Sequence, residues 1–186
     1  MAKRISEVLG VSEDTLKNAG IFNGFVDVDS RLYVDPRLLR DSSAEEMRTS
    51  YKRFKKYFRD VYILLRNTQN KNDVMWRNAR TLLTFKEKPV MALGYSIHGT
   101  AGSAIGSGLA YTLTETAHQI IKAGIAEPTI FELVGLIESG IGPDRISDMT
   151  VAIIFPNLLE YSARMARKFK LATLEYHDKA VPCDPD

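Results

Sequence analysis

The chain has 186 residues, of which 45% are apolar and 26% charged, so it fits one globular domain with a substantial core. The single Cys183 excludes an internal disulfide and a cysteine zinc cluster, and the longest apolar runs are far too short to span a membrane. The N-terminus lacks the apolar segment of a secretory signal, and we predict a cytoplasmic protein with no membrane contact.

The net charge is only +2, but the charges are distributed unevenly along the chain. Residues 40–90 hold 13 Lys or Arg against 6 Asp or Glu, whereas residues 94–163 hold 2 against 7. One interpretation is that a polyanion binds the first part and a cation binds the second. The other is that the two parts neutralise each other by packing together.

The first 41 residues predict a short helix followed by a β-hairpin or two short strands. Ser12 suits a helix N-cap because acidic residues follow it, and Gly20 is a stop signal. Apolar residues at 25–34 flank a polar turn that includes Asp29, which is the pattern of two short paired strands. Asp35 precedes a proline and is expected to cap a further helical turn.

Residues 42–66 form the clearest predicted element, a long amphipathic helix. Its start has the spacing of a capping box, since Ser42 and Ser43 each stand three residues before a glutamate. Apolar residues recur at steps of four and three and form one stripe: Met47, Tyr51, Phe54, Phe58, Val61 and Leu65. The other faces are basic and include Lys52, Lys55, Lys56 and Arg59. This charge run is either a solvated surface or a footprint for a nucleic-acid backbone.

The rest of the chain is predicted to be helical, apart from one buried strand and a glycine-rich loop. The strand is expected at 88–95, and helices are expected at 74–85, 109–124, 127–140, 143–155 and 156–170. Pro156 should kink or restart the last of them, because proline removes a helical hydrogen bond. The predicted fold is α+β and mostly helical, a single domain (1–186) with a helix-and-hairpin subregion (1–41) before a helical core (42–186). The tail VPCDPD closes no element, so the alternative is the N-terminal part of a longer protein.

The glycine-rich loop after the predicted strand carries Gly99, Gly102 and Gly106. Glycines between a strand and a helix let backbone N–H groups converge on an anion, and the helix N-terminus adds partial positive charge. The spacing matches neither a P-loop nor a dinucleotide-binding fingerprint, so these glycines either contact phosphate or only permit tight turns. His98 at the start of the loop is a functional candidate, whereas His118 in the next helix is expected to be a core or boundary residue.

The stretch GIGPDRISDMT, residues 140–150, places Asp144 and Asp148 four residues apart at the start of a predicted helix. Asp144 suits a helix N-cap with weak support from Ser147, but capping does not explain Asp148. Carboxylates at positions i and i+4 share a helix face and repel each other unless a cation lies between them. Arg145 is one candidate cation, and Mg²⁺ or Mn²⁺ is the other because these ions prefer carboxylate oxygens.

Three stretches, VDVDSRLYVDPRLL, GTAGSAIG and ELVGLIESGIGPDRISDMT, resemble a set of uncharacterised bacterial proteins that are loosely associated with phage defence and mobile elements. The resemblance covers most of the chain and implies no specific activity. Pro143-Asp144 also resembles the first half of the PD-(D/E)xK nuclease signature. The second half of that signature is absent: EKP at 87–89 lacks its form, and nothing after Asp148 supplies it.

The predicted function is a nucleic-acid-directed, metal-dependent phosphodiesterase or a nuclease-associated domain, with a role in phage defence. The residues expected to contact the nucleic acid are Lys52, Lys55, Lys56, Arg59, Gly99, Gly102 and Gly106. Asp144 and Asp148 would hold Mg²⁺ or Mn²⁺ and form the catalytic group with His98. The alternative is a non-catalytic interaction or sensor module, which works as a homo-oligomer or as the front end of a larger protein with an effector domain.

Overall fold

The computed structural model describes residues 2–86, 88, 93, 105–124 and 141–171. Its helices in chain order are α1 (Ile5–Leu9), α2 (Glu13–Asn18), the 3₁₀-helices η1 (Pro36–Asp41) and η2 (Glu45–Thr49), α3 (Ser50–Arg66), α4 (Val74–Leu82), α5 (Ser107–Lys122) and α7 (Pro143–Lys168). The described part is mostly helical, as predicted, and none of its helices combines the length and apolar character needed to cross a membrane. The helix expected at 127–140 and most of the strand expected at 88–95 lie outside the described residues.

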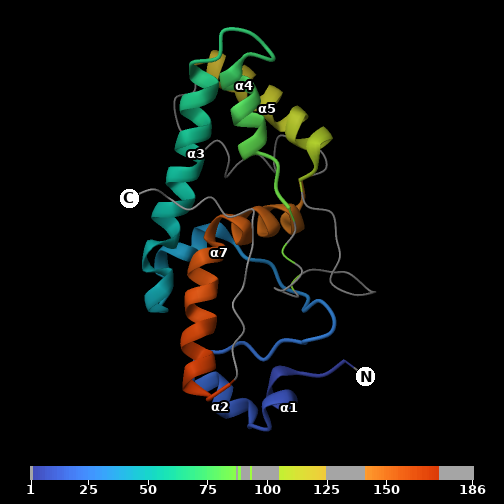
Figure 1. The fold of residues 1–186 in the computed structure, drawn as a ribbon, viewed down its shortest axis with the longest axis vertical. Helices are drawn as coiled ribbons and strands as arrows, with labels where there is room; N and C mark the ends of the chain where they lie inside the picture. The colour runs from blue at the N-terminus through green and yellow to red at the C-terminus, as the bar shows by residue number, and fades with distance from the viewer. Residues whose placement is uncertain (1, 87, 89–92, 94–104, 125–140, 172–186) are drawn as a thin grey trace.

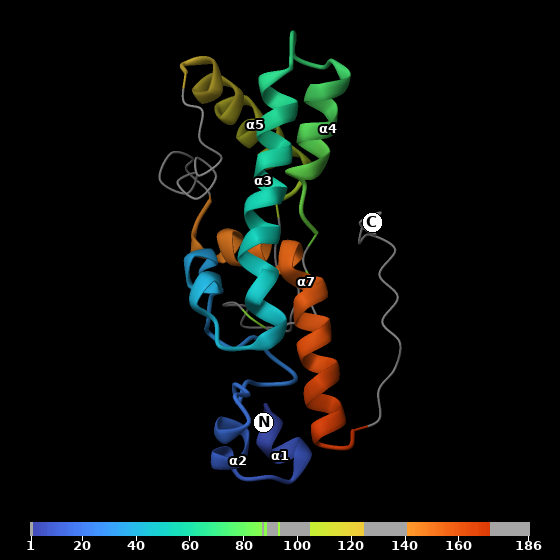
Figure 2. The ribbon, with the colours of Figure 1, turned by 90° about the vertical axis from the view of Figure 1, so that its left-hand side faces the viewer.

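Helix α3 is the long element to which the other parts attach (Figure 1). Helices α4 and α5 pack against one end of α3, and α7 passes behind its other half (Figure 2). α7 then bends and runs toward α1 and α2, which lie at the far end of the molecule (Figure 1). Among the described elements, the α-helices α4, α5 and α7 and the 3₁₀-helices η1 and η2 all contact α3.

The core gathers on the inner side of α3. Four of its side chains, Phe54, Phe58, Val61 and Leu65, are at most 1% exposed, and they belong to the stripe predicted from the sequence. The rings of the two phenylalanines meet edge to face, with 4.9 Å between centroids. Partners come from each neighbouring helix: Trp76 and Ala79 of α4, Leu113 and Ala117 of α5, and Met149 and Ile154 of α7. The periodic apolar pattern thus identified the buried face correctly.

The β-hairpin predicted for residues 25–34 does not form in the structure. Phe25 forms an isolated antiparallel bridge with Arg4, and Ser30 forms an isolated parallel bridge with Leu93. The Ser30 hydroxyl accepts a hydrogen bond from the Phe25 N–H at 3.0 Å, which closes the residues between them into a turn. A hairpin requires the two extended segments to pair with each other, and here each segment pairs with a different part of the chain.

Capping signals predicted the short helices better than the long one. Ser12 caps α2 and Asp35 caps η1, and each accepts a backbone N–H of the helix that it begins. The capping box expected before the long helix does not form, because η2 has Ala44 at its N-cap and α3 starts only at Ser50. The Ser50 hydroxyl donates to the Met47 carbonyl at 2.7 Å, at the junction between η2 and α3.

Helix α7 continues through Pro156 and bends near its middle, where this proline stands (Figure 1). The next residue, Asn157, is 3% exposed, and its Nδ2 donates to the Glu46 carbonyl at 2.7 Å and to Thr49 Oγ1 at 3.2 Å. Arg164 forms an ion pair with Glu46 from the following turns of α7, and this guanidinium lowers the pKa of the Glu46 carboxyl. The second half of α7 is thereby fixed to η2 by polar contacts.

We expect Asn157→Ala to destabilise the protein by about 1–3 kcal/mol, because the part-buried Glu46 carbonyl would lose the donor that the buried Asn157 supplies. Chemical denaturation measures this change. Asn78→Ala is the matched control, since Asn78 is exposed on α4 and its loss should change the free energy of unfolding by less than about 0.5 kcal/mol. Equal stability of the two variants would show that the Asn157 contacts do not hold α7 in place.

Candidate nucleic-acid interface

The outward face of α3 is basic. Between Ser50 and Arg66 the helix carries six Lys or Arg residues and one acid, Asp60. At about 100° per residue, the arc from Lys55 through Lys52 and Lys56 to Arg53 covers about 160° of the helix circumference. Lys52, Lys55, Lys56 and Arg59 are all exposed, and we call this surface the basic face.

In the described part of the chain, no acidic residue of the segment 94–163 forms an ion pair with Lys52, Lys55 or Arg59. Within the described ranges, an ion pair between Lys71 and Glu115 joins the two halves at a place away from the basic face. On α3 itself, Lys56 pairs with Asp60 at 3.1 Å, one turn along the same helix. Lys52, Lys55 and Arg59 form no ion pair with any residue that the structure describes. Their positive charges are therefore directed to solvent.

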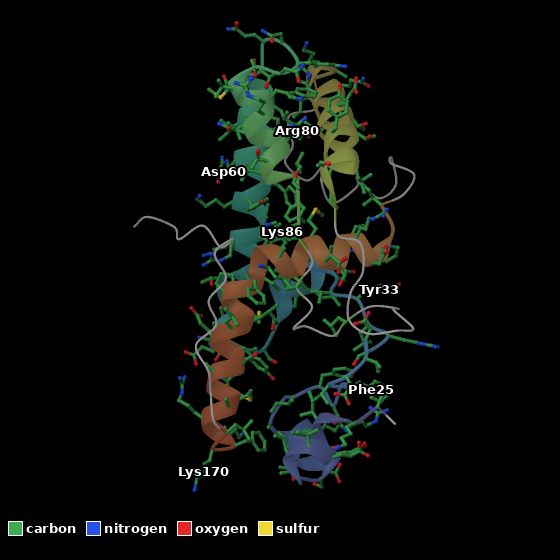
Figure 3. The ribbon with its side chains drawn as sticks, turned by 45° about the vertical axis from the view of Figure 1, so that its right-hand side comes forward. Phe25, Tyr33, Asp60, Arg80, Lys86 and Lys170 are labelled. Atoms are coloured by element: carbon green, nitrogen blue, oxygen red, sulfur yellow. The ribbon has the colours of Figure 1, made fainter. Side chains whose placement is uncertain are left out.

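A cleft of about 440 Å³ adjoins the basic face, between α3, the end of α4 and the bend of α7. It is lined by Arg53, Lys56, Tyr57, Asp60, Thr81, Leu82, Thr84, Phe85, Lys86, Lys88, Ala152, Ile153 and Pro156. Figure 3 shows Asp60 on α3 and Lys86 below the end of α4, close to where α7 crosses. Four cations and one carboxylate line the cleft, so its electrostatic character favours an anion.

The aromatic part of the cleft is held in place by a contact between α3 and α4. The Tyr57 hydroxyl donates to the Leu82 carbonyl at 2.7 Å, and this carbonyl lies at the end of α4, where helical acceptors lack internal partners. Burial raises the pKa of Tyr57 to about 12, so the phenol stays neutral near pH 7. The ring of Phe85 lies 5.8 Å from that of Tyr57, and the Lys88 ammonium lies 4.8 Å from the ring of Phe155.

The bend of α7 forms part of the lining of the same cleft. Pro156 has no N–H, so the carbonyl of Ala152 does not receive the hydrogen bond that a regular helix would supply. Both residues line the cleft. A carbonyl without its helical donor is a hydrogen-bond acceptor for a ligand or for water.

The two carboxylates singled out in the sequence stand in the first two turns of α7. Gly142 is the N-cap, so Asp144 is not the cap that was predicted. Asp144 is exposed, and its Oδ1 lies 2.8 Å from the position that a Gly142 Cβ would occupy, so the carboxylate is folded back over the helix start. This orientation places negative charge at the positive end of the helix. Asp148 is half-buried one turn later and has interactions of its own.

The proposed metal ligands do not belong to a larger cluster in the described ranges, where no three His, Cys, Asp or Glu side chains come together. Mg²⁺ can bind through one or two carboxylates and keep several waters, so Asp144 and Asp148 alone would suit a weakly held ion. Ser147, predicted to support the cap, instead accepts the Val34 N–H at 2.9 Å. It links α7 to the N-terminal segment.

The glycine-rich loop lies mostly outside the described residues, and this applies to His98, Gly99 and Gly102. Gly106 is described and serves as the N-cap of α5, with no side-chain cap. Its backbone φ of −72° is one that other residues also adopt, so the conformation alone does not require glycine there. The phosphate-binding role of the loop stays a prediction.

His118 is buried, as expected, in the contact between α5 and α4. It is 5% exposed, and its ring meets that of Trp76 edge to face with 5.2 Å between centroids. Its Nε2 is buried without a hydrogen-bond partner in the described part of the chain. Desolvation lowers the pKa of this imidazole, as do Lys122 and Lys71 more weakly, while Asp73 acts in the opposite direction.

Sequence reasoning identified the basic face but missed the cleft. Arg53 stands within the basic run, and Lys86 and Lys88 follow the end of the helix predicted at 74–85, so these charges were visible in the sequence. Their proximity to Ala152 and Pro156 could not be predicted, because no local pattern shows that residues about 70 positions apart lie beside one another. The missing N–H of Pro156 was the one signal that pointed to an unsatisfied carbonyl.

The chain belongs to a family described as a domain of unknown function, DUF8370, whose model matches residues 10–182. No curated protein and no solved structure matches the chain. The family description names no activity.

We expect the thermal stability of the protein to fall as the pH is lowered from 7.5 to 5.5. His118 has a folded-state pKa below its ordinary value of 6.5, so the unfolded chain binds its proton first and is favoured by acid. Stability from this group is complete above pH 6.5 and is lost below it. His118→Phe keeps an aromatic ring against Trp76 and should flatten this dependence, measured by melting temperatures across the range. An unchanged dependence would show that burial of His118 does not matter for acid stability.

Proposed function

We propose that this protein is a nucleic-acid-binding domain that contacts the phosphate backbone through the basic face of α3. The observation that carries the proposal is the set of exposed cations on that face: Lys52, Lys55 and Arg59 form no ion pair with any described residue. Nucleic-acid phosphates are regularly spaced anions that Lys and Arg neutralise with release of counterions. The function is thus a binding function, in a cytoplasmic protein, with no reaction assigned.

The shape of the basic face supports a polymer more than a small anion. Its charges extend along successive turns of α3, and the helix lies on one side of the molecule, with its partners behind it (Figure 2). A rigid helix whose inner face is fully packed presents its outer side chains in a defined row. A row of this kind matches a backbone that carries one charge per nucleotide.

The metal-dependent phosphodiesterase expected from the sequence has less support. Helix α7, which carries Asp144 and Asp148 near its start, packs through Met149 and Ile154 on the apolar side of α3. In Figure 2 the helix begins beside α3 and then passes behind it. A backbone bound to the basic face would therefore contact the side of α3 opposite the one against which α7 packs. Cleavage with Mg²⁺ or Mn²⁺ stays a prediction, as do the link to phage defence and the assembly into oligomers.

The test is the salt dependence of binding to a fluorescent 20-nucleotide single strand, followed by anisotropy. If Lys52, Lys55 and Arg59 each contact a phosphate, the triple alanine variant should reduce the slope of log K against log salt by about 2. Loss of the same three contacts should make the variant bind about 100-fold more weakly than the unmodified protein at 0.1 M salt. Intact strand after incubation with Mg²⁺ and Mn²⁺ would support binding without cleavage.

The matched control removes three cations from other parts of the surface. Lys3, Lys17 and Lys168 are exposed on the N-terminal segment, on α2 and at the end of α7. Their triple alanine variant has the same net charge as the first and should lose much less affinity. Equal losses in the two variants would mean that only total charge matters, and no binding by the unmodified protein would refute the proposal.

A further inference from the structure

The cleft beside the basic face has the features of a site for one nucleotide, and this inference rests on the function proposed above. We propose that the cleft receives a single unpaired nucleotide, with its phosphate at the cationic rim and its base against the apolar lining. Two sources share this chemistry, a nucleotide within a single strand and a free mononucleotide. The experiment below separates them.

The size of the cleft suits this ligand. Small-molecule sites usually have volumes of about 300–1,000 Å³, and the cleft has about 440 Å³. It lies where three separate elements meet, the middle of α3, the end of α4 and the bend of α7, and such junctions are common places for ligand sites. A nucleotide would fill it, whereas a base pair within a stacked duplex has no base free to enter.

The cationic side chains are placed to receive a phosphate. Arg53 and Lys56 come from α3, and Lys86 and Lys88 come from the segment after α4, so the positive charges approach from two sides. Asp60 is the one carboxylate in the lining and is already paired with Lys56. Guanidinium and ammonium groups bind phosphate oxygens through charge-assisted hydrogen bonds, which are stronger than neutral ones.

The remaining lining suits a nucleobase. Tyr57, Leu82, Phe85, Ile153 and Pro156 supply aromatic and aliphatic surface. A base has an apolar face for such a surface and polar groups at its edge, which require hydrogen-bond partners. Ala152, whose carbonyl receives no helical hydrogen bond because of Pro156, belongs to the same lining and supplies an acceptor for the N–H donors of a base edge.

The cleft is also continuous with the basic face. Arg53 and Lys56 line the cleft and belong to the basic arc of α3, one turn from Lys52 and Arg59. A strand that follows the basic face therefore passes the opening of the cleft. One nucleotide can turn into it while its neighbours stay on α3, and a preference for single strands over duplex follows.

The experiment compares two fluorescent 12-nucleotide probes with equal phosphate number, a mixed-sequence DNA strand and a strand made entirely of abasic sites. We expect the protein to bind the base-bearing strand about tenfold more tightly, because contact with one base is worth that much in affinity. A duplex of the same length should bind no better than the abasic strand. Adenosine and uridine 5′-monophosphate are titrated separately by calorimetry.

Two variants assign the effect to the cleft. Ala152→Met fills part of the cleft without changing the charge. It should reduce the difference in affinity between the two strands to about threefold or less, while the affinity for the abasic strand is unchanged. Ala163→Met is the matched control on the second half of α7 and should retain the tenfold difference. Lys86→Ala changes an exposed side chain, so this variant should fold normally. It should weaken binding of the base-bearing strand more than binding of the abasic strand.

The outcomes separate this inference from the proposed function. If both strands bind equally in the unmodified protein, or if Ala152→Met and Lys86→Ala leave the difference intact, the cleft does not hold a nucleotide although the basic face still binds backbone. If neither strand binds, the proposed function fails. In that case, if a mononucleotide binds and Lys86→Ala weakens this binding, the cleft is a site for a free nucleotide. If no mononucleotide binds either, the inference is refuted together with the proposed function.

Discussion

The packing of the apolar face of α3 is the contact on which the other features depend. Phe54, Phe58, Val61 and Leu65 are almost fully buried against three helices, and the loss of one such phenylalanine would cost about 3–5 kcal/mol. Because side chains on a helix have fixed angular positions, burial of this face determines which residues point outward. The basic face is therefore a direct consequence of core packing, and rotating it away from solvent would expose the core.

Pro156 imposes the second constraint. A straight α7 of 26 residues would extend away from the core, whereas the bent helix contacts α3 with its first half and η2 with its second. The bend leaves one carbonyl without its helical donor, a cost that the packing of both halves and the Asn157 contacts offset. The bend at Pro156 also forms one wall of the cleft. Thus a residue that weakens its own helix is also the residue that shapes the candidate site.

Features that depend on local periodicity were predicted correctly from the sequence. Features that depend on contacts between distant residues were not. The stripe of α3, the caps at Ser12 and Asp35, and the burial of His118 follow from neighbours within a few positions. The hairpin failed because Phe25 and Ser30 pair with Arg4 and Leu93 instead of with their own neighbours. The role of Ser147 was missed for the same reason, since its hydroxyl accepts an N–H from a residue 113 positions earlier.

The two parts of the candidate site also differ in how far the sequence predicted them. The basic face comes from one helix, so its charges could be predicted from a run of 17 residues, and their exposure followed from the period of the apolar stripe. The cleft needs charge from α3, more charge from the segment after α4, and a carbonyl from α7, and only the tertiary fold brings these together. A field from several cations above an apolar surface is stronger than the same charges would produce on an open helix, because the low-dielectric wall limits screening by water. This difference is the physical reason to expect backbone attraction along α3 and selective recognition in the cleft beside it.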